Sequence, residues 1–371
     1  MDSMTSKERI HAALNHRIPD RVPMNEFLYS RPLYEEVIGR RPTFYNAEDL
    51  FDCAHKLGLD SAVMPIGGFA GIRNSDEDKV EYQDEWMITY HKDEATSWPS
   101  DAPVGFPLKD RADWKNYSVP DIHQDGRLEQ IRIAVQKAKE YQMAVIGATR
   151  GPFTPTWLLF GFERFSVLLF EDPDFLDEVM TKVMDFYIAA GKMLVEAGVD
   201  AVLFADDYGT SAGPFMSPKH YRKHIWPQLS RLVTAVKSTG TPVIMHSDGD
   251  LRKILPDIMQ TGINGYHPME RHANMDIGQI KHEYGQKLTL VGNVDNQGVL
   301  VYGTVAEVVE ATKECLKIAA PGGGYILGSD HSVHDDMPNE NIIAMIETGK
   351  KYGKYPISID SSTDKQNYHA I

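Results

Sequence analysis

Eight short, continuously apolar stretches alternate with helical segments along this chain, and that alternation limits the folds available to it. Continuously apolar runs of this length are typical of buried parallel strands, and helical spacing between them indicates crossover helices. Eight such units predict an α/β fold, a (β/α)8 TIM barrel. The predicted strands span residues 22–27, 60–64, 143–149, 199–205, 243–245, 262–266, 288–292 and 324–328. The predicted helices span residues 5–16, 47–57, 128–141, 155–170, 173–197, 217–237 and 338–352.

One domain accommodates most of the 371 residues, because barrels of this kind often reach that length. We predict a single barrel domain over residues 1–356 and a loose, polar tail over residues 357–371. The rhythm breaks between about residues 72 and 120, where segments 80–83 and 86–90 predict paired antiparallel strands ahead of a proline-rich stretch. We interpret this region as a β-rich excursion inserted over the barrel, since it is too short and polar to hold a core.

Charge and cysteine content restrict the partners and the compartment. A net charge of −15 argues against binding to nucleic acid or to an anionic membrane, both of which require basic surfaces. No apolar run approaches the roughly 20 residues of a membrane span, and residues 1–9 lack the apolar segment of a secretory leader. The two cysteines, Cys53 and Cys315, lie in helical segments and predict no disulfide framework. We therefore expect a cytoplasmic protein with reduced thiols.

Polar side chains follow the predicted strands immediately. The fifth strand leads into His246 and Asp248, and Gly249 then permits a tight turn. Because catalytic groups of parallel barrels lie at the carboxyl ends of the strands, this His-x-Asp pair is placed to supply two ligands to zinc. The rim is predicted to carry further polar residues after the other strands: Glu26, Arg150, Asp206, Asp207, Tyr208, His267, Glu270, Asn293, Asp295, Asp330 and His331.

Further metal ligands are expected from neighbouring strand ends. Glu270 follows the sixth strand, whereas Asp330 and His331 compete for one inward-facing position after the eighth. Asp206 and Asp207 are alternatively expected to orient substrate or a ligand histidine. Each residue alone is as simply explained as a turn or cap, so it is their convergence on one mouth that favours a site. The predicted metal ligands are His246, Asp248, Glu270 and Asp330.

Other common chemistries lack their signatures in this chain. The sequence contains no Walker P-loop, and no GxGxxG motif follows a predicted strand. Neither cysteine lies at a predicted strand end. Nucleotide-dependent and thiol chemistries are therefore disfavoured.

Longer motifs run almost end to end along the chain, and by these it resembles the uroporphyrinogen decarboxylase superfamily. Within that superfamily the resemblance is to the cobalamin-dependent methyltransferase branch. The motifs are specific for the superfamily and weak for the substrate. They occupy residues 5–9, 20–23, 151–154, 205–209, 216–218, 246–249, 292–295 and 338–342.

Two departures from the superfamily's patterns bear on the activity. True decarboxylases carry an Arg-Gln-Ala-Gly-Arg segment after the first strand, which grips the acidic porphyrinogen, whereas this chain offers only Arg31 there. The coenzyme M methyltransferases hold zinc through His-x-Cys and a later Cys, but here the pair is His246-x-Asp248. Carboxylates donate less charge to zinc than thiolates do, which leaves a stronger Lewis acid suited to polarising an ether oxygen.

The resemblance therefore implies a zinc-dependent methyltransferase acting between a small methylated substrate and cobalamin carried by a partner corrinoid protein. A methoxylated aromatic, undergoing O-demethylation, fits the ligand set best, and a homodimer is compatible with the resemblance. A metal-free decarboxylase-like enzyme, or an inactive barrel that only binds a corrinoid or a partner, remains as the alternative. The implied catalytic residues are Asp206, Asp207 and Tyr208. The implied substrate-binding residues are Glu26, Arg150, His267, Asn293 and His331.

Overall fold

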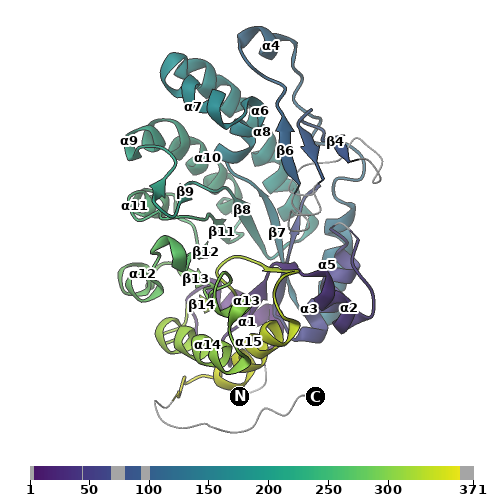
Figure 1. Cartoon of the computed structure of the whole chain (residues 1–371), viewed down its shortest axis with the longest axis vertical. Helices are drawn as coiled ribbons and strands as arrows, with labels where there is room; N and C mark the ends of the chain where they lie inside the picture. The colour runs from purple at the N-terminus through teal and green to yellow at the C-terminus, as the bar shows by residue number, and fades with distance from the viewer. Residues whose placement is uncertain (1–3, 44, 68–79, 93–100, 360–371) are drawn as a thin grey trace.

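A computed structural model describes residues 4–43, 45–67, 80–92 and 101–359. Its central sheet has eight parallel strands in the order β1-β3-β7-β8-β11-β12-β13-β14. The strands from β7 to β14 can be followed in Figure 1. A parallel bridge between Met24 and Leu327 joins the two edge strands, so the sheet closes as the predicted barrel. The strands are β1 (Asn25–Glu26), β3 (Ser61–Pro65), β7 (Ala144–Arg150), β8 (Ala201–Ala205), β11 (Val243–His246), β12 (Gly265–His267), β13 (Thr289–Val291) and β14 (Tyr325–Ile326).

An outer layer of helices covers the barrel, and each buries one apolar face against it. In the longest, Phe175, Val179 and Val183 recur at helical spacing and are fully or almost fully buried. Outer-facing strand residues and these helix faces form one large apolar cluster. The outer helices are α3 (Ala47–Leu57), α5 (Glu129–Tyr141), α8 (Pro173–Ala197), α10 (Trp226–Lys237), α11 (Leu255–Gln260), α12 (Ile277–Tyr284), α14 (Val305–Ala319) and α15 (Asn339–Tyr352).

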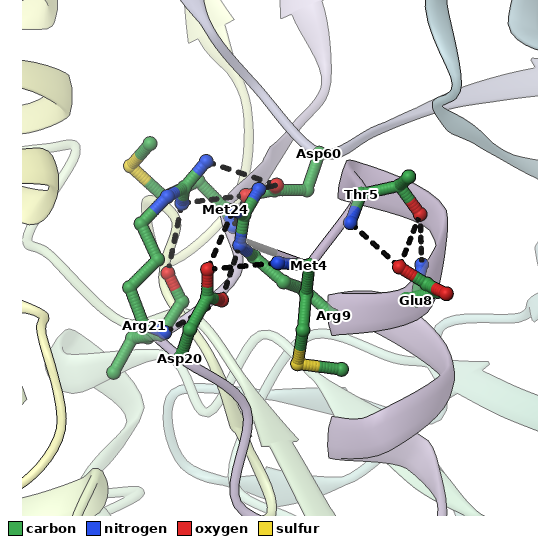
Figure 2. Close-up of polar contacts among 9 residues, drawn as sticks. Met4, Thr5, Glu8, Arg9, Asp20, Arg21, Met24 and Asp60 are labelled. Atoms are coloured by element: carbon green, nitrogen blue, oxygen red, sulfur yellow. Dashed lines mark hydrogen bonds and ion pairs between the residues drawn. The ribbon is translucent and has the colours of Figure 1, made fainter. Parts of the chain in front are cut away.

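Helix α1 (Ser6–Leu14) closes the end of the barrel at which the strands begin. Its residues Ile10 and Leu14 join the strand residues Ile146 and Ile244 in a second apolar cluster, inside the barrel. Figure 2 shows the polar network beside this helix. The fully buried carboxylate of Asp60 accepts hydrogen bonds from the Arg21 guanidinium at 2.7 and 2.9 Å. Asp60 also accepts hydrogen bonds from Arg9 and from the backbone N–H of Met24. This network stabilises the closed end of the barrel, so the candidate site lies at the opposite end.

Two predicted helices are interrupted in the structure, and each interruption has a local cause. Gly161, with φ +78° and ψ 148°, divides segment 155–170 into α6 (Phe153–Phe160) and α7 (Phe162–Glu171). Segment 217–237 consists of α9 (Pro218–His220), the π-helical turn η1 (Tyr221–Ile225) and α10. Pro227 lacks an N–H, and the wider turn lies directly before it.

The excursion predicted over residues 72–120 contains three antiparallel strands within its described part. These are β4 (Glu81–Gln83), β5 (Thr89–His91) and β6 (Ala102–Gly105), followed by α4 (Arg111–Asn116). Segments 68–79 and 93–100 of that region, and residues 360–371 of the predicted tail, lie outside the described residues. None of the described helices is both long and apolar enough to span a membrane.

Short elements complete the rim at the carboxyl ends of the strands. The predicted first strand, 22–27, is shorter than expected and is followed by β2 (Leu28–Tyr29), which pairs with β15 (Val333–His334). Helix α2 (Arg31–Ile38) comes next in the chain. The remaining rim elements are β9 (Gly209–Thr210), β10 (Gly213–Pro214), η2 (Arg271–Ala273) and α13 (Val299–Tyr302).

Candidate metal centre

Parallel pairing brings the histidines of two strands to the same level. In the register of β11 with β12, His246 lies opposite His267, and in that of β11 with β8 it lies opposite Ala205. The chain then turns at Gly249, whose φ is +89°. A Cβ built there would lie 2.2 Å from the carbonyl carbon of Gly209, so the loops after β8 and β11 cross with no room for a side chain.

This crossing places Asp248 beside two histidines from different strand ends. Ligand atoms of His246, Asp248 and His331 all lie within 4.8 Å of one another. His331 Nε2 is 3.1 Å from Asp248 Oδ2, and His246 Nε2 is 3.8 Å from Asp248 Oδ1. The Asp248 Oδ1 atom is buried and has no hydrogen-bond partner among the described residues. A buried carboxylate oxygen without a donor indicates that something else should satisfy it.

The charges within this cluster are strongly coupled. Burial lowers the pKa of His246 and favours its neutral, ligating form. Although burial opposes it, the neighbouring charge of His331 holds the pKa of Asp248 well below its usual range. Burial also lowers the pKa of His331, but the charge and hydrogen bond of Asp248 outweigh it and raise that pKa to about 9. In the absence of metal, a protonated His331 therefore balances the Asp248 carboxylate.

The donor set fits zinc. Two imidazole nitrogens and one carboxylate oxygen are ordinary zinc ligands, and three protein ligands with one open position are typical of catalytic rather than structural sites. Asp207 borders the open side, with Oδ1 3.6 Å from His246 Nε2 and a side chain that is 44% exposed. Partial desolvation and the adjacent charge of Asp248 raise the pKa of Asp207.

His267 lies behind His246 and is 2% exposed. The two Nδ1 atoms are 2.7 Å apart, and the ring planes are inclined by 26° with centroids 4.9 Å apart. Phe27 covers both rings, with centroids 5.6 Å from His246 and 5.2 Å from His267. The sequence predicted His267 as a substrate-binding residue, and the structure places it against the candidate ligand His246.

Two of the four predicted metal ligands lie outside the cluster. The carboxylate of Asp330 accepts hydrogen bonds from the backbone N–H groups of Asn296 at 2.7 Å and Arg271 at 3.1 Å. Glu270 accepts one from the backbone of Gly249 at 2.9 Å. Both therefore brace loops around the site, and His331, which we predicted as a substrate contact, occupies the position expected for Asp330. Burial, only partly offset by its hydrogen bonds, raises the pKa of Asp330 to about 6.

Other predicted site residues support the rim through buried hydrogen bonds. Glu26 accepts hydrogen bonds from the N–H and hydroxyl of Ser329 at 2.7 and 2.8 Å, and burial raises its pKa to about 7. Asp206 accepts hydrogen bonds from the N–H groups of Phe153 and Thr154, which begin α6, and burial raises its pKa to about 6. Both carboxylates thus hold neighbouring segments in place.

Three further predicted residues lie at the same end of the barrel in different surroundings. The Asn293 amide donates to the Met269 carbonyl and is almost fully buried. The Tyr208 ring packs in the apolar cluster between barrel and helices, 5.3 Å from the ring of Tyr221. Arg150 ends β7 and lines a small cavity that also contains Asp84, a residue that strand-end reasoning missed because it belongs to the excursion.

Comparison with known proteins identifies relatives of this chain. The profile of a family described as "Uroporphyrinogen decarboxylase (URO-D)" matches residues 100–352. A methylcobamide:CoM methyltransferase of Methanosarcina acetivorans is 25% identical over 354 residues, covering 95% of this chain and 99% of that protein. A uroporphyrinogen decarboxylase of Pelodictyon phaeoclathratiforme is 26% identical over 263 residues, covering 66% of this chain and 70% of that protein.

The barrel itself has a close structural counterpart. A solved methyltransferase from Methanosarcina mazei superposes with a TM-score of 0.76 at 23% identity. The superposition covers 94% of this chain and 99% of the other. This likeness establishes the fold, and the chemistry depends on the strand-end residues described above.

Proposed function

Because the chain belongs to the uroporphyrinogen decarboxylase family, we propose that it is a zinc-dependent methyltransferase within that family. It moves a methyl group between a small methylated substrate and cobalamin carried by a corrinoid protein. The observation that supports this most directly is the His246–Asp248–His331 cluster with its unsatisfied carboxylate oxygen. The relative with the broadest coverage among those compared, a methylcobamide:CoM methyltransferase, favours the same branch.

The ligand set bears on the substrate. Two imidazoles and a carboxylate, without thiolate, leave a bound zinc ion electron-poor and suited to polarising an ether oxygen. We therefore favour O-demethylation of a methoxylated aromatic over transfer to a thiol. Phe27, which packs against His246, adds an aromatic face at the same strand ends.

The chain's own residues take distinct roles in this proposal. His246, Asp248 and His331 hold the metal, which when bound supplies Lewis-acid polarisation of the atom that releases or receives the methyl group. Asp207, half-exposed beside the cluster, is the residue placed to hold a proton near that atom. Asp206 acts through α6 by bonding its first N–H groups, so it positions the rim and does not touch substrate.

A porphyrinogen decarboxylase would need cationic groups for the many carboxylates of its substrate. The single arginine after the first strand is already engaged, because Arg31 donates from its backbone N–H and its Nε to Asp335, at 2.7 and 2.6 Å. The acids Asp207 and Asp248 at the mouth would repel such a substrate. The engagement of Arg31 by Asp335 and the acidic mouth together favour the methyltransferase over the decarboxylase.

The decisive experiment measures zinc binding and methyl transfer in ligand variants. His246→Ala, Asp248→Ala and His331→Ala should each weaken zinc binding by about a hundredfold or more and abolish methylcobalamin formation from cob(I)alamin and methoxyarenes. His282→Ala, which removes an exposed histidine on α12, is the control and should retain both. Wild-type zinc affinity in His331→Ala would contradict the ligand set. Conversion of uroporphyrinogen by the purified chain would contradict the choice of branch.

A further inference from the structure

One side of the rim carries an exposed aromatic ridge, which we define as Phe162, Val167, Phe170 and Phe215. The first three project from α7 on the side opposite its buried residues Phe165 and Leu168. Their exposed fractions are 41% for Phe162, 38% for Val167 and 72% for Phe170, and Phe215 is 42% exposed. Every exposed phenylalanine among the described residues belongs to this ridge. Contiguous exposed apolar surface of this kind marks interaction sites.

The ridge is continuous between two segments of the chain. The Phe215 ring lies 5.3 Å from that of Phe162, and the Phe170 ring lies 4.9 Å from that of His220. The segment from β10 through α9 therefore runs alongside α7, and both lie on the same side of the molecule (Figure 1). Aromatic side chains held by neighbouring rings lose little entropy when a partner covers them.

The ridge is also attached to the metal centre. Phe215 donates from its backbone N–H to the carbonyl of Tyr208 at 2.8 Å. Phe153, whose ring lies 5.7 Å from that of Phe215, donates to Asp206. Both contacts lead to the end of β8, where Asp207 borders the cluster. The ridge thus stands on the rim through which any bulky co-substrate must approach.

The segment that follows Asp207 beside the ridge is basic in an otherwise acidic molecule, whereas α7 itself carries the exposed acids Glu163 and Glu171. Residues 208–247 contain no Asp or Glu in a chain of net charge −15. Lys219 and Lys223 are exposed and make no ion pair within the described residues, whereas Arg222 is paired with Asp257. The basic residues of the segment are Lys219, Arg222, Lys223, Arg231 and Lys237.

We infer that the aromatic ridge and its flanking lysines bind the corrinoid-carrying protein. The matching surface of that partner is an apolar patch bordered by carboxylates. This inference rests on the proposed function. Methyl transfer requires cobalt to approach the methyl carbon at the barrel mouth within about 3–3.5 Å, so the carrier must sit on this rim. Lys219 and Lys223, which make no ion pair within the described residues, attract an acidic partner.

The test compares protein-bound with free cob(I)alamin as the acceptor of the methyl group from a methoxyarene. The variants are Phe170→Asp and the double variant Lys219→Glu/Lys223→Glu, assayed with free cob(I)alamin and with a purified corrinoid protein whose cobalamin is reduced to cob(I)alamin. We expect the KM for the corrinoid protein, relative to that for free cob(I)alamin, to rise at least about tenfold in both. Ile18→Asp and Lys139→Glu change exposed residues outside the ridge and should leave this ratio unchanged.

Each other outcome overturns a defined part of the proposal. Ridge variants whose KM ratio matches that of the controls would exclude docking here, as would a wild-type chain that methylates free cob(I)alamin but no corrinoid protein. A dimer that Phe170→Asp converts to monomer in sedimentation velocity would make the ridge a self-interface. Cosedimentation with vesicles of about one-third anionic lipid, lost in Phe170→Asp, would make it a membrane contact. A wild-type chain that uses neither form of corrinoid refutes the proposed function instead.

Discussion

A metal-binding histidine usually donates its second ring N–H to a carboxylate or a backbone carbonyl. Here His267 occupies that position behind His246. Two ring nitrogens 2.7 Å apart can share only one proton. Since His246 Nε2 faces Asp207 and Asp248, its Nδ1 must carry that proton for Nε2 to bind metal. His267 is then a neutral acceptor, in keeping with burial, which lowers its pKa well below the usual value.

Removing this acceptor should loosen metal binding without removing a ligand. We expect His267→Phe, which keeps a flat ring, to weaken zinc binding by about 10- to 100-fold, and His267→Gln, which restores an acceptor, to recover part of the loss. Chelator competition measures the affinity, and ¹⁵N shifts of the ring nitrogens in metal-free protein report the tautomer directly. A protonated Nε2 on His246 at neutral pH would contradict the assignment.

At this scale the sequence named His246 and Asp248 as ligands and offered His331 only as the competitor of Asp330, whereas the structure groups His331 with the first two. His246 and Asp248 follow a recognisable strand and precede an obligatory turn, so their position was readable. The choice between Asp330 and His331 could not be read from the sequence, because it depends on backbone pairing. The N–H of Asp330 donates to the carbonyl of Val294, and its carboxylate accepts hydrogen bonds from the backbones of Asn296 and Arg271. Nor does any local pattern announce a histidine pair formed across β11 and β12.

At the scale of elements, the crossing of Gly249 over Gly209 should control the metal centre. Gly249→Ala would place a Cβ on a backbone with φ of +89°, which is strained for alanine, and that Cβ would overlap the backbone of Gly209. We expect a loss of about 3 kcal/mol or more in the free energy of unfolding, together with weaker zinc binding as Asp248 moves.

Gly240 offers a matched control for that variant. Its φ is +85°, but a Cβ there would meet nothing within 4 Å. Gly240→Ala should therefore cost only about 1 kcal/mol, from backbone strain alone, and should leave zinc affinity unchanged. Urea unfolding and chelator competition on both variants separate strain from overlap. Equal losses in the two would show that the crossing is not tight.

Family motifs and element boundaries carried different information. The motif around Asp20 and Arg21 belongs to the network that fixes the closed end of the barrel, so it reports the fold and not the chemistry. The strand-end motif at His246 reports the site. The break at Gly161 was hidden because glycine is tolerated within helices, and only its φ and ψ reveal that the helix ends there.

For the whole molecule, the apolar alternation was sufficient to predict the barrel, because few folds accommodate eight buried parallel strands with crossovers. The excursion was predicted as β-rich from its alternating residues, and β4, β5 and β6 confirm strands in its described part. The ridge was not predicted, because its members are distant in sequence and become neighbours only when α7 lies beside the segment after β10.

Buried acids at the strand ends should also give the metal-free protein an unusual pH dependence. Burial raises the pKa of Glu26 to about 7, and those of Asp206 and Asp330 to about 6. A carboxyl group whose pKa is higher in the folded than in the unfolded state binds its proton more tightly in the folded state. Its contribution to stability is therefore greatest below the unfolded pKa and is lost as pH rises through the folded one.

For Glu26 this window lies between its ordinary pKa of 4.5 and about 7. Between pH 5 and 7.5 we expect the wild-type free energy of unfolding to fall by about 2 kcal/mol more than that of Glu26→Gln, which cannot ionise. Urea unfolding of metal-free protein at the two pH values gives both slopes, and the comparison cancels all other titrating groups. Parallel slopes would mean that the hydrogen bonds from Ser329 and Phe27 keep Glu26 ionised throughout, and that burial does not dominate at this strand end.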